Sequence, residues 1–149
     1  MKVGLVASSG GHLSQLRALA PWFNDHERAW VTFDTPHARR SLVGESVTFA
    51  HHPTNRSLVN LVRNFAVARR WVRMERPDLV VSTGAGVGVP FLWVARSAGI
   101  KTVFMEVYDR VDARSLTGRL VGPIVDVVVL QREAQRRLYP RGVVLGAAQ

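Results

Sequence analysis

An apolar strand and a turn of small residues open the chain, in the sequence Val3-Gly4-Leu5-Val6-Ala7-Ser8-Ser9-Gly10-Gly11-His12. After the turn, leucines recur at helical spacing over residues 13–19, which predicts a helix that begins directly behind the glycines. The free backbone N–H groups at such a helix start favour a phosphate or pyrophosphate. The turn therefore predicts an anion-binding site formed by Ser8, Ser9, Gly10 and Gly11. Small residues are also common at strand-to-helix turns that bind no ligand, and this alternative stays open.

His12 stands at the rim of this turn. Because an imidazole titrates near neutrality, His12 is a candidate to take a proton from a hydroxyl or to hydrogen-bond a phosphate oxygen. The turn lacks the full patterns G-x-G-x-x-G and G-x-x-x-x-G-K-[ST], so neither NAD binding nor phosphate-loop ATP hydrolysis is supported by a complete motif.

Length and composition indicate one globular domain over residues 1–149, with 47% hydrophobic residues. The absence of cysteine excludes disulfides, thiolate metal sites and a cysteine nucleophile. The net charge of +9 comes mainly from arginine and indicates an acidic partner, such as a phospholipid surface, a pyrophosphate-linked substrate or nucleic acid. The uncharged run over residues 82–95 is shorter than the ~20 residues of a membrane span, so we expect no transmembrane segment. Because Met1 and Lys2 precede the first strand directly, we also expect no secretory signal.

Short apolar runs alternate with helical periodicity along the chain, which predicts an α/β fold with a single Rossmann-like parallel sheet and helices on both faces. We expect strands over residues 2–7, 29–33, 46–50, 79–83, 101–106 and 126–130. We expect helices over residues 12–20, 36–43, 57–75, 88–98, 115–121 and 132–138.

A second glycine-rich turn, Ser82-Thr83-Gly84-Ala85-Gly86, lies between a predicted strand and an apolar helix. Ligands of open parallel sheets collect at the carboxyl ends of strands, so the two turns are expected to face one another. We therefore predict that Thr83, Gly84, Ala85 and Gly86 bind the substrate, although close packing of a helix on a strand also demands glycine. Glu106, at the end of the next strand, is a candidate general base beside this crevice, a ligand of a sugar hydroxyl, or an ion-pair partner of Arg110 or His12.

The predicted helix 57–75 is capped by Ser57 and carries apolar residues on two sides. We expect one side to face the core, formed by Leu58, Leu61, Val62, Phe65 and Val72. The other side is a candidate membrane-binding face, formed with its neighbours by Arg63, Val67, Arg70, Trp71 and Met74. A contact with a partner protein, or a solvated arginine face with a half-buried Trp71, fits the same pattern.

Four segments together resemble the bacterial PssD/CpsF-type polysaccharide biosynthesis subunits. These segments are residues 6–12, Pro53-Thr54-Asn55-Arg56, residues 82–90 and Glu106-Val107-Tyr108-Asp109-Arg110. Those subunits are relatives of the fourteenth ALG protein, the membrane-side subunit of a UDP-GlcNAc transferase, and of the N-terminal domain of MurG. The resemblance covers nearly the whole chain, and it implies the N-terminal, acceptor-binding half of a GT-B glycosyltransferase.

This resemblance implies a subunit of a two-component glycosyltransferase that transfers a sugar from a UDP-sugar to a polyprenyl-diphosphate-linked saccharide in surface polysaccharide biosynthesis. His12 and Glu106 are then the catalytic candidates, and the two glycine turns with Asn55 and Arg56 bind the acceptor. A partner subunit carries the UDP-sugar, so no cofactor is expected on this chain, which recruits that catalytic partner to the membrane. The expected location is the anionic cytoplasmic face of the plasma membrane, by peripheral attachment.

Two other classes remain as alternatives. A non-catalytic dinucleotide-binding protein would use Asp34, at the end of the second predicted strand, for a ribose. A nucleic-acid-binding domain would explain the positive charge, but no recognisable module accompanies it, so we expect no nucleic-acid partner. The five histidines show no ligand spacing with carboxylates, so we expect no metal.

Overall fold

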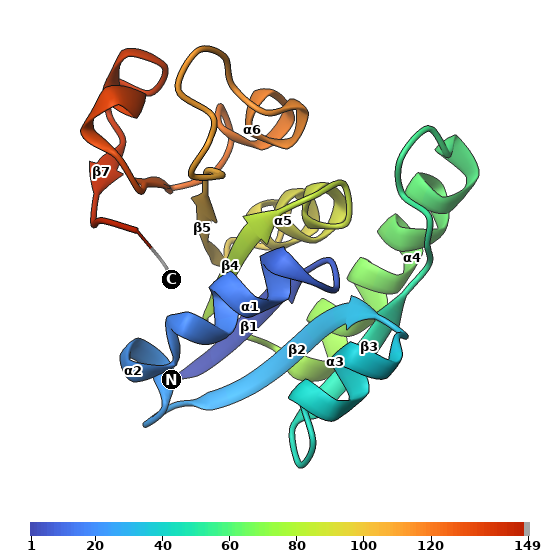
Figure 1. The fold of residues 1–149 in the computed structure, drawn as a ribbon. Helices are drawn as coiled ribbons and strands as arrows, with labels where there is room; N and C mark the ends of the chain where they lie inside the picture. Colours follow the sequence, from blue (N-terminus) through green and yellow to red (C-terminus); the bar gives the residue numbers. More distant parts are fainter. Residues whose placement is uncertain (148–149) are drawn as a thin grey trace.

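The computed structural model describes residues 1–147 and has one seven-stranded sheet in the order β3-β2-β1-β4-β5-β6-β7 (Figure 1). The strands are Lys2–Ala7 (β1), Glu27–Phe33 (β2), Ser46–Ala50 (β3), Leu79–Gly84 (β4), Lys101–Met105 (β5), Val127–Leu130 (β6) and Val143–Val144 (β7). Every neighbouring pair is parallel, which confirms the predicted fold class.

Six α-helices and one 3-10 helix connect the strands over residues 1–147. They are Gly11–Ala18 (α1), Ala20–Phe23 (α2), Pro36–Ser41 (α3), Leu58–Glu75 (α4), Gly88–Ser97 (α5), Leu116–Val121 (α6) and the 3-10 helix Glu133–Arg137 (η1). The side chains of Thr35, Ser57 and Ser115 cap α3, α4 and α6 by accepting a hydrogen bond from a backbone N–H three residues later.

The helices cover both faces of the sheet, because side chains of a strand alternate between its faces. On one face α4, α5 and α6 pack around a core that includes Val6, Phe91 and Phe104. On the other face α1, α2 and α3 pack on a second core that includes Leu5 and Leu16.

Three short elements differ from the prediction. α2 was not predicted as a separate helix; Pro21 lies in its first turn, where the fixed φ and missing N–H of proline are tolerated. The segment expected as a helix over 132–138 is the 3-10 helix η1. β7 was not predicted, because two residues are too few to show an alternating pattern.

The predicted core side of α4 is confirmed for Val72 and wrong for the first turns of the helix. Leu58 and Val62 are 78% and 68% exposed, whereas Trp71, expected on the outer side, is 2% exposed. The Trp71 ring meets Phe91 edge-on at 5.5 Å, and a Cβ on Gly4 would collide with it. The N-terminal turns of α4 extend past the carboxyl ends of the strands (Figure 1), so their apolar side chains find no sheet to cover.

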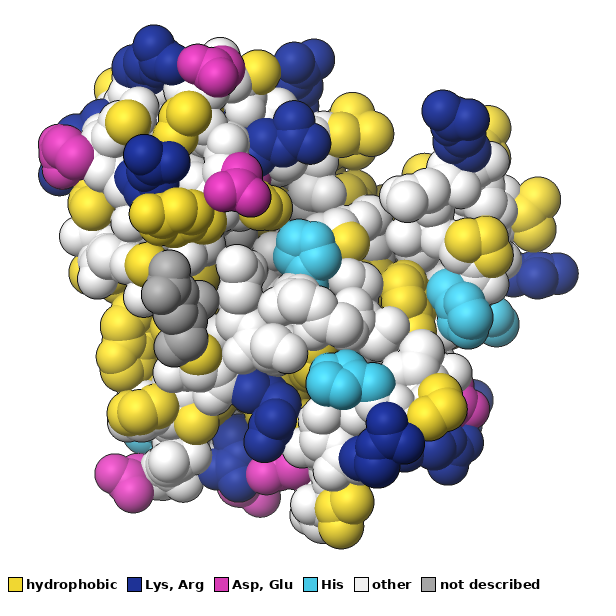
Figure 2. Space-filling model, viewed as in Figure 1, with side chains coloured by type: hydrophobic (Ala, Val, Ile, Leu, Met, Phe, Trp, Pro, Cys, Tyr) yellow, Lys and Arg dark blue, Asp and Glu magenta, His cyan; other side chains and the backbone are white. Residues whose placement is uncertain are grey.

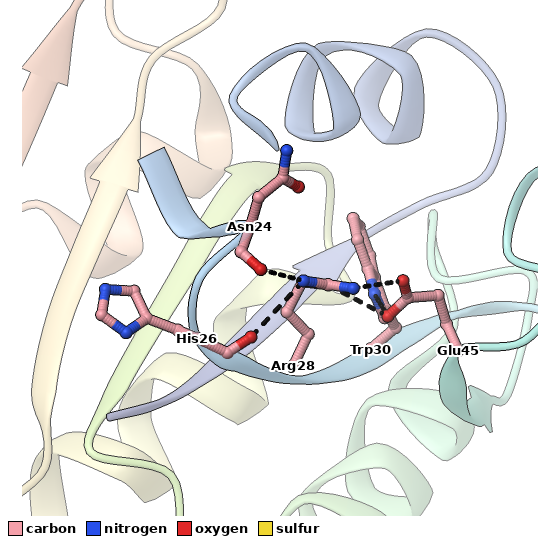
Figure 3. Close-up of polar contacts among 5 residues, drawn as sticks. All are labelled: Asn24, His26, Arg28, Trp30 and Glu45. Atoms are coloured by element: carbon pink, nitrogen blue, oxygen red, sulfur yellow. Dashed lines mark hydrogen bonds and ion pairs between the residues drawn. The ribbon is translucent and has the colours of Figure 1, made fainter. Parts of the chain in front are cut away.

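The opposite, amino-terminal edge of the sheet is closed by a polar network around Arg28 (Figure 3). Its guanidinium donates to both carboxylate oxygens of Glu45, at 3.1 and 2.8 Å, and to the backbone oxygens of Asn24 and His26. The indole Nε1 of Trp30 donates to the same carboxylate at 2.9 Å. The hydrogen bonds from Arg28 and Trp30 outweigh partial burial and lower the pKa of Glu45.

Candidate functional site

The two predicted turns meet where the strand order reverses. β1 and β4 are neighbours at the centre of the sheet, with Ala7 paired to Gly84, while β2 continues the sheet on one side and β5 on the other. Loops that follow such neighbouring strands form a crevice at their carboxyl ends.

Thr83 and His12 join the two turns through reciprocal hydrogen bonds. The Oγ1 of Thr83 donates to the backbone oxygen of His12 at 2.8 Å, and the Nδ1 of His12 lies 2.9 Å from the backbone oxygen of Thr83. Because a carbonyl oxygen only accepts, Nδ1 carries the hydrogen of this bond. In a neutral imidazole Nε2 is then unprotonated, so the ring presents a proton acceptor.

A third segment packs against the second turn and completes one wall. A Cβ on Gly86 would lie 3.1 Å from the Oγ1 of Thr54, so glycine allows this close approach. The side chain of Asn60 donates to the backbone oxygen of Pro53 at 2.8 Å, which fixes the segment to the start of α4. Arg56 adopts a left-handed φ of 59° in this segment.

These segments border an open cavity of about 1040 Å³, visible as a hollow between the α6 side and the α4 side of the molecule (Figure 2). Its lining residues are His12, Thr54, Asn55, Arg56, Ser57, Leu58, Leu61, Gly84, Ala85, Gly86, Val89, Val107, Arg110, Ser115, Leu116, Thr117 and Leu120.

One part of this lining is cationic and another is apolar. Arg56 and Arg110 line the cavity with His12, and neither arginine forms an ion pair within residues 1–147. No carboxylate of the described chain lines the cavity. The apolar part comes from α4, α5 and α6 and consists of Leu58, Leu61, Val89, Leu116 and Leu120. Such a surface suits a ligand with an anionic group and an attached hydrocarbon.

The structure brings about half of the predicted site residues into this cavity. His12, Asn55, Arg56, Gly84, Ala85 and Gly86 line it. The lining does not include Ser8, Ser9, Gly10, Gly11 and Thr83. Thr83 is fully buried behind the second turn. The other four form the turn from β1 into α1, whose N-cap Gly10 has a φ of 81° that favours glycine.

Glu106 does not lie where the sequence predicted. Its side chain is 0% exposed and is not part of the lining, so the expectation that its carboxylate borders the crevice is wrong. The carboxylate turns inward because three donors surround it: the backbone N–H groups of Val107 and Ser115 and the hydroxyl of Tyr139. The pairing with Arg110 or His12 is absent from the ion pairs and hydrogen bonds of the described residues.

Sequence reasoning missed the apolar part of the cavity and Arg110 as a lining residue. The sequence did contain a sign that Leu58 and Leu61 line the cavity. Both stand in the first turn of a helix that directly follows a turn, where no strand lies beneath them. Leu116 and Leu120 share one side of α6 at a spacing of four residues, which is the helical repeat.

The predicted membrane residues divide into two groups. Arg63, Arg70 and Met74 are exposed, whereas Val67 and Trp71 pack against the core. Within residues 1–147, no helix combines the length and the apolar character that crossing a bilayer requires. The same part of the chain contains no group of three or more histidine, aspartate or glutamate side chains that could hold a metal ion.

A parallel sheet with a crevice at this reversal of strand order is the fold of the N-terminal, Rossmann-like half of a GT-B glycosyltransferase. The sequence matches the family model described as "Oligosaccharide biosynthesis protein Alg14 like" over residues 2–148. The chain therefore belongs to the Alg14-like family.

Curated relatives and solved structures agree with this assignment. The UDP-N-acetylglucosamine transferase subunit ALG14 of Homo sapiens is 25% identical, in a match covering 98% of this chain and 82% of that protein. The UDP-N-acetylglucosamine–N-acetylmuramyl-(pentapeptide) pyrophosphoryl-undecaprenol N-acetylglucosamine transferase of Alkaliphilus metalliredigens is 31% identical over 56% of this chain and 22% of its own length.

Among solved structures, Acinetobacter baumannii MurG superposes with a TM-score of 0.80 at 18% identity, covering 99% of this chain and 46% of that one. A UDP-N-acetylglucosamine 2-epimerase from Rickettsia bellii gives a TM-score of 0.79 at 16% identity, covering 99% of this chain and 45% of that one. The chain thus spans less than half the length of either enzyme, and these likenesses describe its fold.

Proposed function

We propose that this chain is the acceptor-binding subunit of a two-component glycosyltransferase that transfers a sugar from a UDP-sugar to a polyprenyl-diphosphate-linked saccharide in surface polysaccharide biosynthesis. The cavity carries this proposal, because an anion-binding part and an apolar part adjoin in one space. A diphosphate fits Arg56, Arg110 and the N–H groups of the second glycine turn. The first isoprene units fit against the leucines of α4 and α6.

His12 is the proposed catalytic base. The acceptor hydroxyl oxygen attacks the anomeric carbon of the donor sugar, the bond from that carbon to the UDP oxygen breaks, and the hydroxyl proton moves to Nε2 of His12. The hydrogen bond from Nδ1 to Thr83 keeps Nε2 in the form that accepts this proton. The leaving UDP is bound by the partner subunit.

A catalytic partner subunit supplies the UDP-sugar site, and this chain brings it to the membrane. The human relative is named as a subunit of a UDP-N-acetylglucosamine transferase, which supports this division. Peripheral attachment to the anionic cytoplasmic membrane face uses the exposed end of α4, where hydrophobic and basic side chains lie side by side (Figure 2). Leu58, Val59 and Val62 are more than 60% exposed there, and Arg63 lies beside them.

The dinucleotide-binding alternative is not favoured by the structure. Both carboxylate oxygens of Asp34 accept hydrogen bonds from Arg39, at 2.6 and 2.8 Å, and Asp34 does not line the cavity. The carboxylate that would hold a ribose is therefore paired with Arg39 and lies outside the cavity.

The test is acceptor binding and transfer by the complex of this chain with its donor-binding partner, using an undecaprenyl-diphosphate-linked saccharide. We expect Arg56→Ala and Arg110→Ala each to weaken binding of the lipid diphosphate roughly tenfold or more, as for a charge-assisted hydrogen bond. We expect His12→Ala to lower kcat by roughly 10²–10⁴-fold while acceptor affinity changes little.

The matched control is Arg73→Ala, which removes an exposed arginine of α4 that does not line the cavity. It should leave both binding and transfer near the wild-type level. If Arg73→Ala weakened acceptor binding as much as Arg56→Ala does, the effect would come from overall charge, and the cavity would not be the acceptor site.

A further inference from the structure

Glu106 is a buried carboxylate that the proposed reaction does not use. Its Oε1 accepts a hydrogen bond from the backbone N–H of Val107 at 2.9 Å. Its Oε2 accepts from the N–H of Ser115 at 3.2 Å and from the hydroxyl of Tyr139 at 2.5 Å. With 0% exposure and both oxygens engaged, Glu106 has no access to a hydroxyl of a bound acceptor.

The element that Glu106 holds in place is α6, which supplies the cavity with Leu116, Thr117 and Leu120. Ser115, whose N–H Glu106 binds, is the N-cap of this helix, and its Oγ accepts from Gly118 at 2.9 Å. A Cβ on Gly118 would lie 2.5 Å from Oε2 of Glu106 and would also collide with the hydroxyl of Tyr139. Glycine at this position therefore lets α6 rest directly on the carboxylate and the tyrosine.

The same contacts reach the loop that follows β5. The Nε2 of Gln135 donates to the backbone oxygens of Val107 and Arg110, at 2.8 and 3.1 Å. Gln131 donates to the backbone oxygen of Glu106 at 2.9 Å. Val107 and Arg110 both line the cavity, so residues 131–139 hold this side of it from behind.

Burial and the Glu106 carboxylate raise the pKa of Tyr139, so its hydroxyl remains protonated and continues to donate. The guanidinium of Arg114 lies over the ring of Tyr139 at 4.7 Å and donates to the backbone oxygen of Leu138. The ring of Tyr139 is therefore held by Arg114 over its face in addition to the hydrogen bond of its hydroxyl.

We propose that Glu106 is a positioning residue rather than the base: its carboxylate, with the hydroxyl of Tyr139, holds α6 and the loop 107–110 as one rigid wall of the cavity. This inference rests on the proposed function only where it concerns the acceptor. The wall itself is a property of the folded chain, and it sets how well the acceptor fits rather than how its proton is removed.

Hydrogen exchange gives the first readout and needs no substrate. In Glu106→Gln an amide N–H₂ replaces one carboxylate oxygen and faces either the N–H of Val107 or the N–H of Ser115 with the hydroxyl of Tyr139, and Tyr139→Phe removes one donor. We expect both variants to exchange the amides of α6 roughly tenfold faster or more, while the amides of β1 and β4 remain as in the wild type. Unchanged exchange in α6 in both variants would overturn the proposal.

Transfer kinetics of the complex with the donor-binding partner give the second readout. We expect Glu106→Gln and Tyr139→Phe to raise the acceptor KM roughly tenfold, with kcat within about threefold of wild type and an unchanged donor KM. The double variant should be little worse than the more affected single variant, because the two groups act through one contact. A loss of kcat of roughly 10³-fold or more in Glu106→Gln, with KM unchanged, would identify Glu106 as the base instead.

Asp109→Asn and Tyr108→Phe are matched controls in the same loop. Asp109 is exposed, and neither its side chain nor that of Tyr108 lines the cavity. Neither the carboxylate of Asp109 nor the hydroxyl of Tyr108 forms an ion pair or hydrogen bond in the described part of the chain. Both controls should behave as wild type in exchange and kinetics. If the wild-type complex transferred no sugar, the proposed function would fail, while the exchange of α6 would still decide whether Glu106 holds the wall.

Discussion

One backbone oxygen determines what His12 can do. Because the carbonyl of Thr83 accepts from Nδ1, the neutral ring has its free lone pair on Nε2, and the imidazole orientation is fixed before any substrate arrives. Thr83 in turn is fixed by its own hydroxyl, which donates back to the backbone of His12. The two turns therefore hold the imidazole ring in place through hydrogen bonds that form when the chain folds.

Trp71 is a core residue, so its removal should affect stability rather than membrane binding. We expect Trp71→Ala to lower the free energy of unfolding by about 3–5 kcal/mol, because the ring fills the space above Gly4 and against Phe91. Urea unfolding followed by far-UV circular dichroism measures this change.

Trp71→Phe is the control, and its effect should be clearly smaller. The buried Nε1 of Trp71 has no hydrogen-bond partner within the described residues, so replacing the indole by a phenyl ring sacrifices packing alone. If Trp71→Ala unfolded like the wild type and instead lost affinity for vesicles, the outward orientation first expected from the sequence would be right.

The glycine turns and His12 were predictable, whereas the burial of Glu106 was not. A turn is a local feature, and the order of small residues after an apolar strand is sufficient to indicate it. The partner that draws Glu106 inward is Tyr139, 33 residues further along the chain. No periodicity in the sequence links these two positions, since only the folding of β6 and η1 brings them together.

At the scale of elements, α4 shows that helical periodicity alone does not identify which side of a helix faces the core. Both sides of α4 carry apolar residues, and the larger set at its start was predicted to face the core. The buried residues are Asn64, Ala68, Trp71 and Val72, of which only Val72 was predicted to face the core, because only the later turns cover the sheet. Asn64 is accommodated there by two hydrogen bonds to the backbone of His51, at 2.8 and 3.0 Å. The strands were predicted more closely, since their apolar runs are continuous in a parallel sheet.

The exposed start of α4 should bind anionic membranes. We expect the double variant Leu58→Ser/Val62→Ser to reduce binding to phosphatidylglycerol-containing vesicles roughly tenfold or more, because two large apolar side chains leave the interface. Co-sedimentation with vesicles measures the binding.

Val43→Ser is the matched control, since Val43 is 81% exposed but follows α3, which packs on the other face of the sheet. It should sediment as the wild type does. Equal losses in both variants would mean that general surface hydrophobicity, and not this end of α4, causes the binding.

The network around Arg28 ties β2 to the segment before β3, and it predicts a stability difference that depends on pH. The pKa of Glu45 is lowered by hydrogen bonds from Arg28 and Trp30, so the folded state binds the proton more weakly than the unfolded state does. The stabilisation is therefore complete above the unfolded pKa of ~4.3 and disappears as pH falls through the lower folded value.

We expect Glu45→Gln to lower the free energy of unfolding by about 1–2 kcal/mol at neutral pH, with a difference from wild type that shrinks toward zero in acid. Urea unfolding at several pH values measures it. Asp34→Asn, which breaks the exposed pair with Arg39, should change stability much less at every pH, because solvent screens that pair. A difference for Glu45→Gln that stayed constant down to pH 3 would contradict the assignment of the effect to this ion pair.

At the scale of the whole molecule, the amino-terminal and carboxyl-terminal edges of the sheet differ in how their polar side chains are paired. At the amino-terminal edge Arg28, Trp30 and Glu45 bond to one another, whereas at the carboxyl edge Arg56 and Arg110 line the cavity and form no ion pair within residues 1–147. The net charge of +9 adds a long-range attraction toward anionic surfaces. The amino-terminal edge thus contributes to stability, and the carboxyl-terminal edge carries the proposed acceptor site.

This separation leads to a last prediction, about the donor. The cavity of this chain is proposed to hold the acceptor, so we expect the chain alone to bind the undecaprenyl-diphosphate-linked saccharide but to show no heat of binding with millimolar UDP in titration calorimetry. In complex with the donor-binding partner, UDP binding and sugar transfer should both appear. His12→Ala in that complex should then abolish most transfer while UDP affinity stays unchanged, because the histidine acts on the acceptor hydroxyl and not on the leaving group. If the chain alone bound UDP and completed the transfer, donor and acceptor would share one polypeptide, and the proposed division between two subunits would be wrong.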